Sequence, residues 1–584
     1  MNQKSEKSME QYFFRASAAD FKKIPGSPIA YWVGAKTLSI LGVSKKLGDI
    51  ADARMGLATG NNAKYVRQWS EVSTGNIGFL ISNRDVAKRS GLRWFPYCKG
   101  GQFRKWFGNN EHVIDWLGDG EELQTTLHPA GARIWAHNFN LDHIFEDSLT
   151  WSDITSGRLS VRYNSHGFLF DGSGTCAFFR SEEEKLAALG FLNTQFANDF
   201  SKVLNPTLHF QTGDFRSMPY REGLLSPGFI GGVKELVSKA KRDWDSFENS
   251  WGFTNLSILH SDYRHSSLKD TYQSLRVHWR EVTEEMQRLE EENNRLFIET
   301  YGLQDELKYE VPLKEITLTC NPHYRYGGVK TEAELESQLQ SDTMAEFLSY
   351  ALGCMFGRYS LDKPGLVLAN QGDTLAEYLR QIPEPRFMPD EDNVIPLLDG
   401  EWFADDVTER FRTFLRVTFG EEHYEENLAF IEASLGKDVR KYFIKDFYTD
   451  HVKRYKKRPI YWLFASPKGT FSALIYLHRY RPDTVSVVLQ YLRDFRKKLA
   501  ARLDYLQQVG ISASASQGEK TRALKEIETL KKQLLELDDY ERDTLYPLAT
   551  EQVPLDLDDG VKVNYLKLGS ALKKIVGLDA KGED

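Results

Sequence analysis

In two stretches of the chain, apolar residues recur at alternating spacings of four and three positions, which is the pattern of a helix with one packed seam. The first stretch predicts a long helix within residues 226–310. Asn293 stands on its seam, where a buried polar side chain can specify register. Packing within the same chain and dimerisation through the seam are both open interpretations. The seam positions are Leu275, Trp279, Val282, Met286, Leu289, Asn293 and Leu296.

The second stretch lies near the end of the sequence, where residues 484–509 and 519–541 both have helical patterns. The segment 510–518 between them is rich in Gly, Ser and Ala, so the sequence predicts an antiparallel helical hairpin. The seam positions of its second helix are Ala523, Ile527, Leu530, Leu534 and Leu537.

Other short patterns predict strands and one further helix. Residues 159–163 alternate between apolar and polar and lead into the apolar run 167–171, whereas 459–464 has the pattern of a buried strand. Residues 182–204 predict a single amphipathic helix. The expected fold class is therefore α+β, with a β-rich domain, long spacer helices of coiled-coil type and a C-terminal mixed α/β region.

These patterns divide the chain into six expected segments. They are a connecting segment at 1–45, a β-rich domain at 46–225, a helical spacer at 226–310, a mixed α/β domain at 311–483, the helical hairpin at 484–545 and a tail at 546–584.

Residues 83–108 are a basic stretch in an acidic chain. The 584 residues carry a formal net charge of −8, whereas residues 80–110 hold seven Lys and Arg and one acid, a local balance of +6. Interleaved aromatic residues favour a folded surface, and Gly100 with Gly101 favours a turn between strands. The stretch predicts a β-hairpin or strand-loop-strand unit that presents cations to DNA. The alternative is a charged hairpin over an aromatic minicore.

Ten residues are candidate DNA contacts, because Lys and Arg neutralise phosphates and polar side chains pair with base edges. A second basic run, 453–458, is a candidate phosphate contact, with a solvated linker as the alternative. The ten candidates are Arg84, Lys88, Arg89, Arg93, Lys99, Gln102, Arg104, Lys105, Arg162 and Asn164.

No motif in the chain points to catalysis or to a bound metal. The four cysteines are scattered without a CxxC pair, which argues against a zinc ribbon and fits a reducing cytosol. Asp171 to Gly174 is interpreted as a β-turn, because no Lys-Ser/Thr pair follows it. The acidic run 389–392 lacks the downstream partner of a nuclease site. No apolar run of membrane-spanning length occurs, so we expect no membrane segment.

Four longer strings are more specific. Together they resemble the PglX-type adenine-specific DNA methyltransferases of BREX phage-defence systems, and residues 204–220 are similar to the end of target-recognition domains in that family. The four strings are KKIPGSPIAYW (22–32), GLATGNN (56–62), RWFPYCKGGQFRKWFGN (93–109) and KRPIYWLFASPKGTFSALIYLHRY (457–480).

The resemblance implies S-adenosylmethionine-dependent N6-adenine methylation for the complete protein. Family members carry the methyltransferase domain before the string at 22–32, and this chain holds neither its Gly-rich cofactor loop nor its Pro-Pro-Tyr loop. No catalytic or cofactor-binding residue is therefore carried over, and only target recognition by 46–225 transfers. The implied partners are double-stranded DNA, the methyltransferase domain or other BREX components and, on electrostatic grounds, acidic DNA-mimicking phage inhibitors. The implied location is the cytoplasm.

Three functions remain in competition. The leading hypothesis is a DNA target-recognition module braced by spacer helices. The second is a protein-interaction scaffold that uses the heptad seams and the net acidity for assembly. The third is a self-contained enzyme such as a nuclease.

Overall fold

The computed structural model describes residues 17–22, 27, 35–43, 45–154, 158–221 and 226–579. Most of the expected connecting segment 1–45 lies outside these residues, as does nearly all of the string at 22–32. The chain divides into two compact units, and the predicted spacer 226–310 contributes to both. Unit 1 draws on 1–66, 78–244 and 278–329, and unit 2 on 67–77, 245–277 and 330–584.

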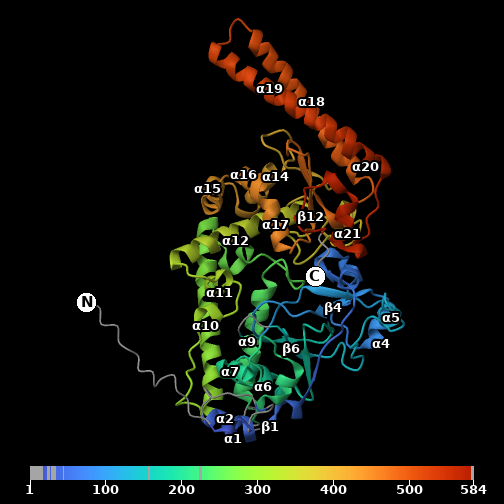
Figure 1. Cartoon of the computed structure of the whole chain (residues 1–584). Helices are drawn as coiled ribbons and strands as arrows, with labels where there is room; N and C mark the ends of the chain where they lie inside the picture. Colours follow the sequence, from blue (N-terminus) through green and yellow to red (C-terminus); the bar gives the residue numbers. More distant parts are fainter. Residues whose placement is uncertain are drawn as a thin grey trace, which may run out of the picture. The chain divides into compact units, whose positions relative to one another are not determined.

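Two small sheets organise unit 1 (Figure 1). The first has the order β2-β9-β6-β7 with antiparallel pairings, and in the second β4 pairs antiparallel with β5 and parallel with β8. Every residue of β4 and β6 is buried, which accounts for the aromatic residues in these strands. The strands are β2 (Ala51–Arg54), β4 (Trp94–Cys98), β5 (His112–Asp115), β6 (Ser148–Trp151), β7 (Val161–Asn164), β8 (Leu169–Phe170) and β9 (Cys176–Phe179).

The remaining elements of unit 1 are short strands and the helices around the sheets. The turn expected at Asp171 to Gly174 is present, since the Gly174 amide donates to the Asp171 carbonyl at 3.0 Å. The elements are α1 (Ala18–Phe21), α2 (Ala35–Val43), β1 (Lys45–Lys46), α3 (Asn62–Tyr65), α4 (Arg84–Ser90), α5 (Leu117–Thr125), α6 (Glu182–Leu192), α7 (Gln195–Leu204), α8 (Thr212–Ser217), β10 (Pro219–Tyr220) and α11 (Pro322–Tyr326). β3 (Val66–Gln68), α9 (Pro227–Asp245) and α10 (Leu268–Tyr301) have residues in both units.

Residues 182–204 form two helices, α6 and α7, so the prediction of a single helix is wrong. Thr194 is the N-cap of α7, and its hydroxyl accepts from the amide of Ala197 at 3.2 Å. The break follows from Asn193, whose side chain bonds both the amide and the carbonyl of Val161 at 2.9 Å. Asn193 thereby supplies hydrogen-bond partners for the edge strand β7, and its backbone is no longer helical.

The basic stretch 83–108 starts with a helix, α4, that the sequence pattern did not predict. Asn83 caps it by accepting a hydrogen bond from the amide of Val86 at 3.0 Å, and Gly91 ends it with a φ of 67°. Three candidate cations therefore lie on a helix and not on a strand.

The tight turn expected at Gly100 and Gly101 is also wrong, although a strand-loop-strand unit is present. β4 pairs with β5 only after the long loop 99–111. In this loop the Gly101 amide donates to the hydroxyl of Ser152 at 3.0 Å, and a Cβ on Gly100 would lie 2.8 Å from the carbonyl oxygen of Ser173. Close backbone approach, together with φ values of 74° and 147° at Gly100 and Gly101, therefore favours glycine here.

The seam of α10 makes contacts within unit 1. The Asn293 Nδ2 group donates to the carbonyl of Gly190 in α6 at 3.0 Å, and Asn293 is buried. Phe297, on the next turn of α10, lies 5.7 Å from the ring of Phe191. These contacts favour packing within the same chain over dimerisation through this part of the seam.

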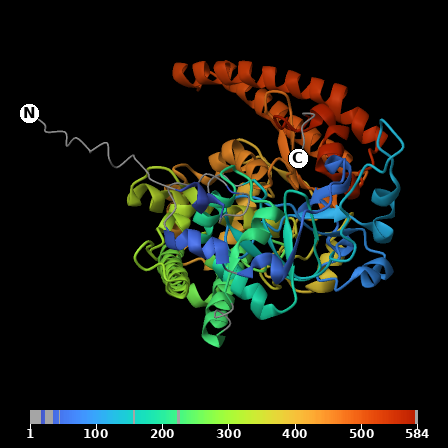
Figure 2. The same ribbon diagram turned by 60° about the horizontal axis from the view of Figure 1, so that its bottom comes forward.

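Unit 2 combines a three-stranded sheet, order β11-β13-β12, with a majority of helices. The predicted helical hairpin is present as α18 and α19, which lie side by side in Figures 1 and 2. The α+β class is thus confirmed. The elements are α12 (Glu332–Met355), α13 (Leu375–Gln381), β11 (Ile395–Pro396), α14 (Val407–Phe419), α15 (Tyr424–Leu435), α16 (Val439–Tyr442), α17 (Tyr448–Arg454), β12 (Tyr461–Ala465), β13 (Ser472–Tyr476), α18 (Thr484–Ile511), α19 (Gln517–Tyr540), α20 (Tyr546–Glu551) and α21 (Gly560–Lys567).

Candidate nucleic-acid interface

Two exposed cations of the basic stretch lie on α4. Lys88 and Arg89 are exposed in the last turn of this helix, where positive charge is favoured by the helix dipole. The Nε group of Arg89 donates to the carbonyl of Asp85 at 3.2 Å, within the same helix. Both side chains can meet a polyanion without any rearrangement of the fold.

Arg84 is instead held by a carboxylate. It forms a bidentate ion pair with Asp119, with Nε–Oδ1 at 3.1 Å and Nη2–Oδ2 at 2.5 Å. Asp119 stands between Gly118 and Gly120 in α5, and all three have left-handed φ values of 61°, 69° and 73°. A non-glycine residue in this conformation costs about 1 kcal/mol or more, which the ion pair with Arg84 offsets in part. The contact places α4 beside α5 (Figure 1).

A groove of about 450 Å³ opens beside α5. Arg93 lines it and pairs with Asp115 at 2.8 Å, so the predicted contact Arg93 is already matched by an acid. Glu122, also in the lining, pairs with Lys64. The groove therefore carries little unmatched positive charge.

A short finger, residues 126–135, follows α5 directly and was not predicted. The Trp135 amide donates to the Thr126 carbonyl at 3.0 Å and the His128 amide to the Arg133 carbonyl at 2.9 Å, so the two sides are paired. Next to its base, the paired Leu127 and Ile134 are 58% and 44% exposed, and Arg133 is exposed as well. The sequence signal for this element is the turn-forming segment Pro129 to Gly131 between two paired apolar residues.

The base of the finger rests on the string GLATGNN. A Cβ on Gly60 would lie 2.4 Å from the Cδ1 atom of Trp135, and Gly60 has a φ of 74°. Glycine is thus required at position 60 both for space and for backbone conformation. We name Lys88, Arg89, Leu127, Arg133 and Ile134 the α4–finger surface, since both of its parts adjoin α5.

Two other predicted contacts, Arg104 and Lys105, are buried inside unit 1, so the expectation that they present cations at the surface is wrong. Arg104 pairs with Asp243 at 2.7 Å, and Lys105 pairs with Glu290 of α10. Glu290 also accepts from the indole of Trp106 at 2.7 Å. Burial lowers the pKa of Lys105 even though Glu290 opposes the shift. These cations attach the loop 99–111 to the helices of unit 1.

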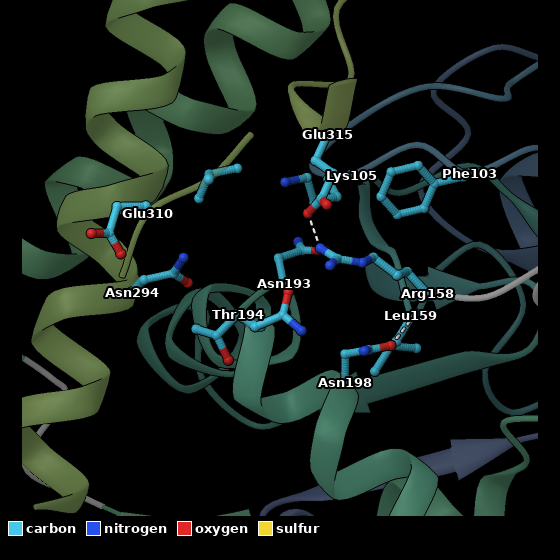
Figure 3. Close-up of a pocket in the computed structure, with 12 residues that line it drawn as sticks. Phe103, Lys105, Arg158, Leu159, Asn193, Thr194, Asn198, Asn294, Glu310 and Glu315 are labelled. Carbon is cyan, nitrogen blue, oxygen red and sulfur yellow. Dashed lines mark hydrogen bonds and ion pairs between the residues drawn. The ribbon is translucent and has the colours of Figure 1, made fainter. Parts of the chain in front are cut away.

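Lys105 also borders the small pocket of Figure 3, beside the ion pair between Arg158 and Glu315. Asn193, between α6 and α7, and Asn198 of α7 also line it. The cavity volume is about 20 Å³, room for about one water molecule. The pocket is therefore too small for a nucleotide or a cofactor.

Arg162 and Asn164, the predicted base-reading residues of β7, are also buried. The Arg162 Nη1 group donates to the carbonyl of Arg104 at 3.4 Å. Hydrogen bonding from Cys176, together with the nearby Arg162 charge, lowers the pKa of Cys98 to about 6. Arg162 thus faces a buried pair of thiols and not solvent.

The last two predicted contacts lie on the loop 99–111. Gln102 is exposed, and its carbonyl accepts from Asn109 at 2.9 Å. Lys99 is half-buried, and its carbonyl accepts from the hydroxyl of Ser173 at 3.0 Å. Gln102 and Lys99 are therefore more exposed than Arg104 and Lys105.

The basic run 453–458 lies in unit 2 and is also only partly exposed. Arg454 pairs with the buried carboxylate of Glu248 at 3.0 Å. Lys453, Lys456 and Lys457 are exposed. Arg458 is largely buried and lies 4.0 Å from Glu71, so the run offers three surface lysines and two structural arginines.

The acidic run 389–392 is built around Asp390. This carboxylate is buried and lies 3.8 Å from Arg410. Burial and the charge of Asp392 raise the pKa of Asp390 to about 7. Within the described ranges, no three His, Cys, Asp or Glu side chains cluster as metal ligands. No helix in the described part of the chain combines the length and apolar character needed to cross a bilayer.

Two curated proteins are similar to this chain. The adenine-specific methyltransferase PglX of Lacticaseibacillus casei (strain Zhang) is 37% identical over 583 residues, which cover 97% of this chain and 46% of the relative. The adenine-specific methyltransferase BrxX of Escherichia coli O9:H4 (strain HS) is 37% identical over 576 residues, 95% of this chain and 45% of the relative. The chain spans less than half the length of each. No protein-family model matches the sequence.

Proposed function

We propose a function for this chain from its homology, over nearly its whole length, to adenine-specific methyltransferases of the PglX type, which confirms the resemblance of its sequence strings. In this proposal, the chain contains the DNA target-recognition module of a site-specific N6-adenine methyltransferase in a BREX phage-defence system. The complete protein would use S-adenosylmethionine as methyl donor in the cytoplasm. We assign the methyl transfer to the complete protein and no catalytic or cofactor-binding residue to this chain.

The observation that carries the proposal is the α4–finger surface of unit 1. Among the described residues, Lys88, Arg89 and Arg133 are exposed and form no ion pair with an acid, so they are open to a polyanion in a chain whose net charge is −8. Such cations fix a protein on the duplex through its phosphates, largely without regard to sequence. The exposed Leu127 and Ile134 are apolar side chains of the type that enter a groove against sugars and base edges. Gln102 and Lys99 are further candidates for polar contacts.

The experiment is duplex binding by the chain alone, measured by fluorescence anisotropy at about 50 mM and about 200 mM salt. We expect binding at low salt and a steep loss at the higher concentration, because each phosphate contact releases counterions. Absence of binding at low salt would contradict the proposal. A divalent-metal cleavage assay on the same duplex is expected to yield no product.

The scaffold remains the second candidate, on a separate observation in unit 2. The α18–α19 hairpin exposes Tyr505, Ile511, Leu524 and Leu535, with fractions between 58% and 77%. An apolar surface of this kind suits contacts with other defence components. An acidic DNA-mimicking inhibitor would instead compete for the α4–finger surface, so competition with duplex separates the two kinds of partner.

A further inference from the structure

Unit 2 contains an open pocket of about 710 Å³ that no part of the proposed function uses. One wall is the turn 466–469 between β12 and β13, and the other is the segment 565–579. The volume lies in the range of pockets that hold a bound ligand. We name it the lysine-rimmed pocket after Lys468, Lys573 and Lys574, which line it and are exposed.

The floor of the pocket is apolar and well packed. Leu572, Ile575 and Leu578 line it and are each less than 7% exposed. Outside the floor, Leu566 also lines the pocket and is 52% exposed, and Val576 nearby is 82% exposed. A ligand that fills the pocket would therefore bury apolar surface, which favours a ligand with at least one large apolar group.

Both walls are held in place by the rest of unit 2. Glu536 of α19 accepts from the Lys468 amide at 2.7 Å and from the Thr470 hydroxyl at 2.5 Å. On the other side, the Lys573 amide donates to the Leu463 carbonyl of β12 at 2.8 Å, and the Tyr540 hydroxyl donates to the Ala571 carbonyl at 2.8 Å. The pocket is therefore preformed, which lowers the entropic cost of binding.

The charge on the rim is largely unmatched. Among the residues that the structure describes, Lys468, Lys573 and Lys574 form no ion pair with an acid. Among the described lining residues, Asp579 is the one carboxylate against these three ammonium groups. In a chain with a net charge of −8, this concentration of unmatched cations indicates a negatively charged ligand.

The position of the lysines also restricts the ligand. They come from two segments far apart in the sequence, so the negative charges of the ligand must be distributed along it. Its described lining residues include no arginine and no exposed aromatic face on which a base can stack, since Tyr565 is buried and its hydroxyl donates to the Lys573 carbonyl. A phosphate backbone would leave the apolar floor unfilled.

We propose that the lysine-rimmed pocket binds an acidic peptide segment of a partner protein, with one large apolar side chain on the floor and Asp or Glu side chains at the three lysines. This inference does not depend on DNA binding, because the pocket lies in unit 2 and shares no residue with the α4–finger surface.

The test starts with selection of random short peptides displayed on phage against the immobilised full chain. We expect enrichment of sequences that combine Asp or Glu with Leu, Phe or Trp. The enriched peptide, labelled with fluorescein, is then titrated with the wild-type chain and with K468E/K573E/K574E. We expect at least about a tenfold loss of affinity, since three attractive contacts become repulsive.

Two further variants keep the result interpretable. Ser570→Trp fills the pocket without a change of charge and should lower the affinity for the peptide by a similar factor. The matched control K525E/K531E/K532E makes the same charge change at exposed lysines of α19 that do not line the pocket, and it should bind as wild type does. Thermal unfolding of all variants identifies any that fail to fold.

Four outcomes would overturn the proposal. The first is an enriched set without the combination of acidic and apolar residues. The second is peptide binding that K468E/K573E/K574E and Ser570→Trp leave unchanged. The third is that K468E/K573E/K574E binds duplex DNA more weakly than the wild type does but binds the peptide equally well, which would assign the lysines to nucleic acid. Binding of the dye 8-anilinonaphthalene-1-sulfonate at this site without any peptide binding would likewise replace the peptide by a small organic anion.

Discussion

The guanidinium of Arg104 lies 2.7 Å from the carboxylate of Asp243, and both side chains are only 3% exposed. Asp243 also accepts from the amides of Thr319 at 2.7 Å and Cys320 at 3.0 Å. The basic stretch 83–108 is therefore partly internal, and Arg104 is a structural element of unit 1.

Removal of Arg104 is expected to destabilise the fold and not merely to weaken DNA binding. Arg104→Ala leaves the carboxylate of Asp243 buried and unpaired, which costs about 3–5 kcal/mol in the free energy of unfolding. Arg89→Ala, at an exposed position of α4, should change it by less than about 0.5 kcal/mol. Urea unfolding of both variants checks the difference, and equal stability would show that the Arg104–Asp243 pair contributes nothing.

The exposed cations of the α4–finger surface should control duplex binding without an effect on stability. We expect K88Q/R89Q/R133Q to lower the affinity and to reduce the slope of log K against log salt by about 0.9 for each phosphate that is no longer neutralised. Thermal unfolding should remain that of the wild type. The matched control is K525Q/K531Q/K532Q in unit 2, and a slope that changes equally in both variants would contradict the assignment.

Cys98 should titrate near neutral pH. Its folded pKa of about 6 is below its ordinary value of 9.0, so its contribution to stability is complete above about pH 9 and is lost as the pH falls through about 6. Thiolate absorbance in the ultraviolet should show one thiol titrating near pH 6. That step should be absent in Cys98→Ser and shifted upward in Arg162→Met, because the buried cation is gone. A wild-type titration without this step would refute the assignment.

Asp390 should make unit 2 less stable as the pH rises. Its folded pKa of about 7 is above its ordinary value of 3.8, so the native state binds the extra proton. The associated stability is complete below about pH 4 and is lost as the pH rises through about 7, with a total of a few kcal/mol. Asp390→Asn should flatten the dependence of unfolding free energy on pH between these values. Asp504→Asn, at an exposed position of α18, is the control that should leave it unchanged.

The contact between Asn293 and Gly190 should matter for stability and not for assembly. A Cβ on Gly190 would come within 2.7 Å of the Phe229 ring and 2.9 Å of the Asn293 Oδ1 atom. Gly190→Ala is therefore expected to cost about 1–3 kcal/mol through overpacking. Sedimentation of Asn293→Leu should match that of the wild type, and a change of oligomeric state would favour the dimeric seam.

Several elements could be predicted because their causes are local. The repeats of Leu and Ile specify α18 and α19, and the apolar run at 459–464 specifies β12, since periodicity decides which face is buried. The break at Asn193 could not be predicted in this way, because it depends on the backbone of Val161, 32 positions away in the sequence. The finger was missed because its turn residues are common in loops of every kind.

For the candidate interface, the sequence by itself determined that this acidic chain concentrates cations between Asn83 and Gly108. It also determined the resemblance to the PglX-type methyltransferases. Tertiary structure alone decided which cations remain at the surface. Arg104 and Lys105 meet Asp243 and Glu290, 139 and 185 positions away, whereas Lys88 and Arg89 lie on a short exposed helix. The physical reason is that a buried charge needs an opposite charge at contact distance, and only the fold brings such distant residues together.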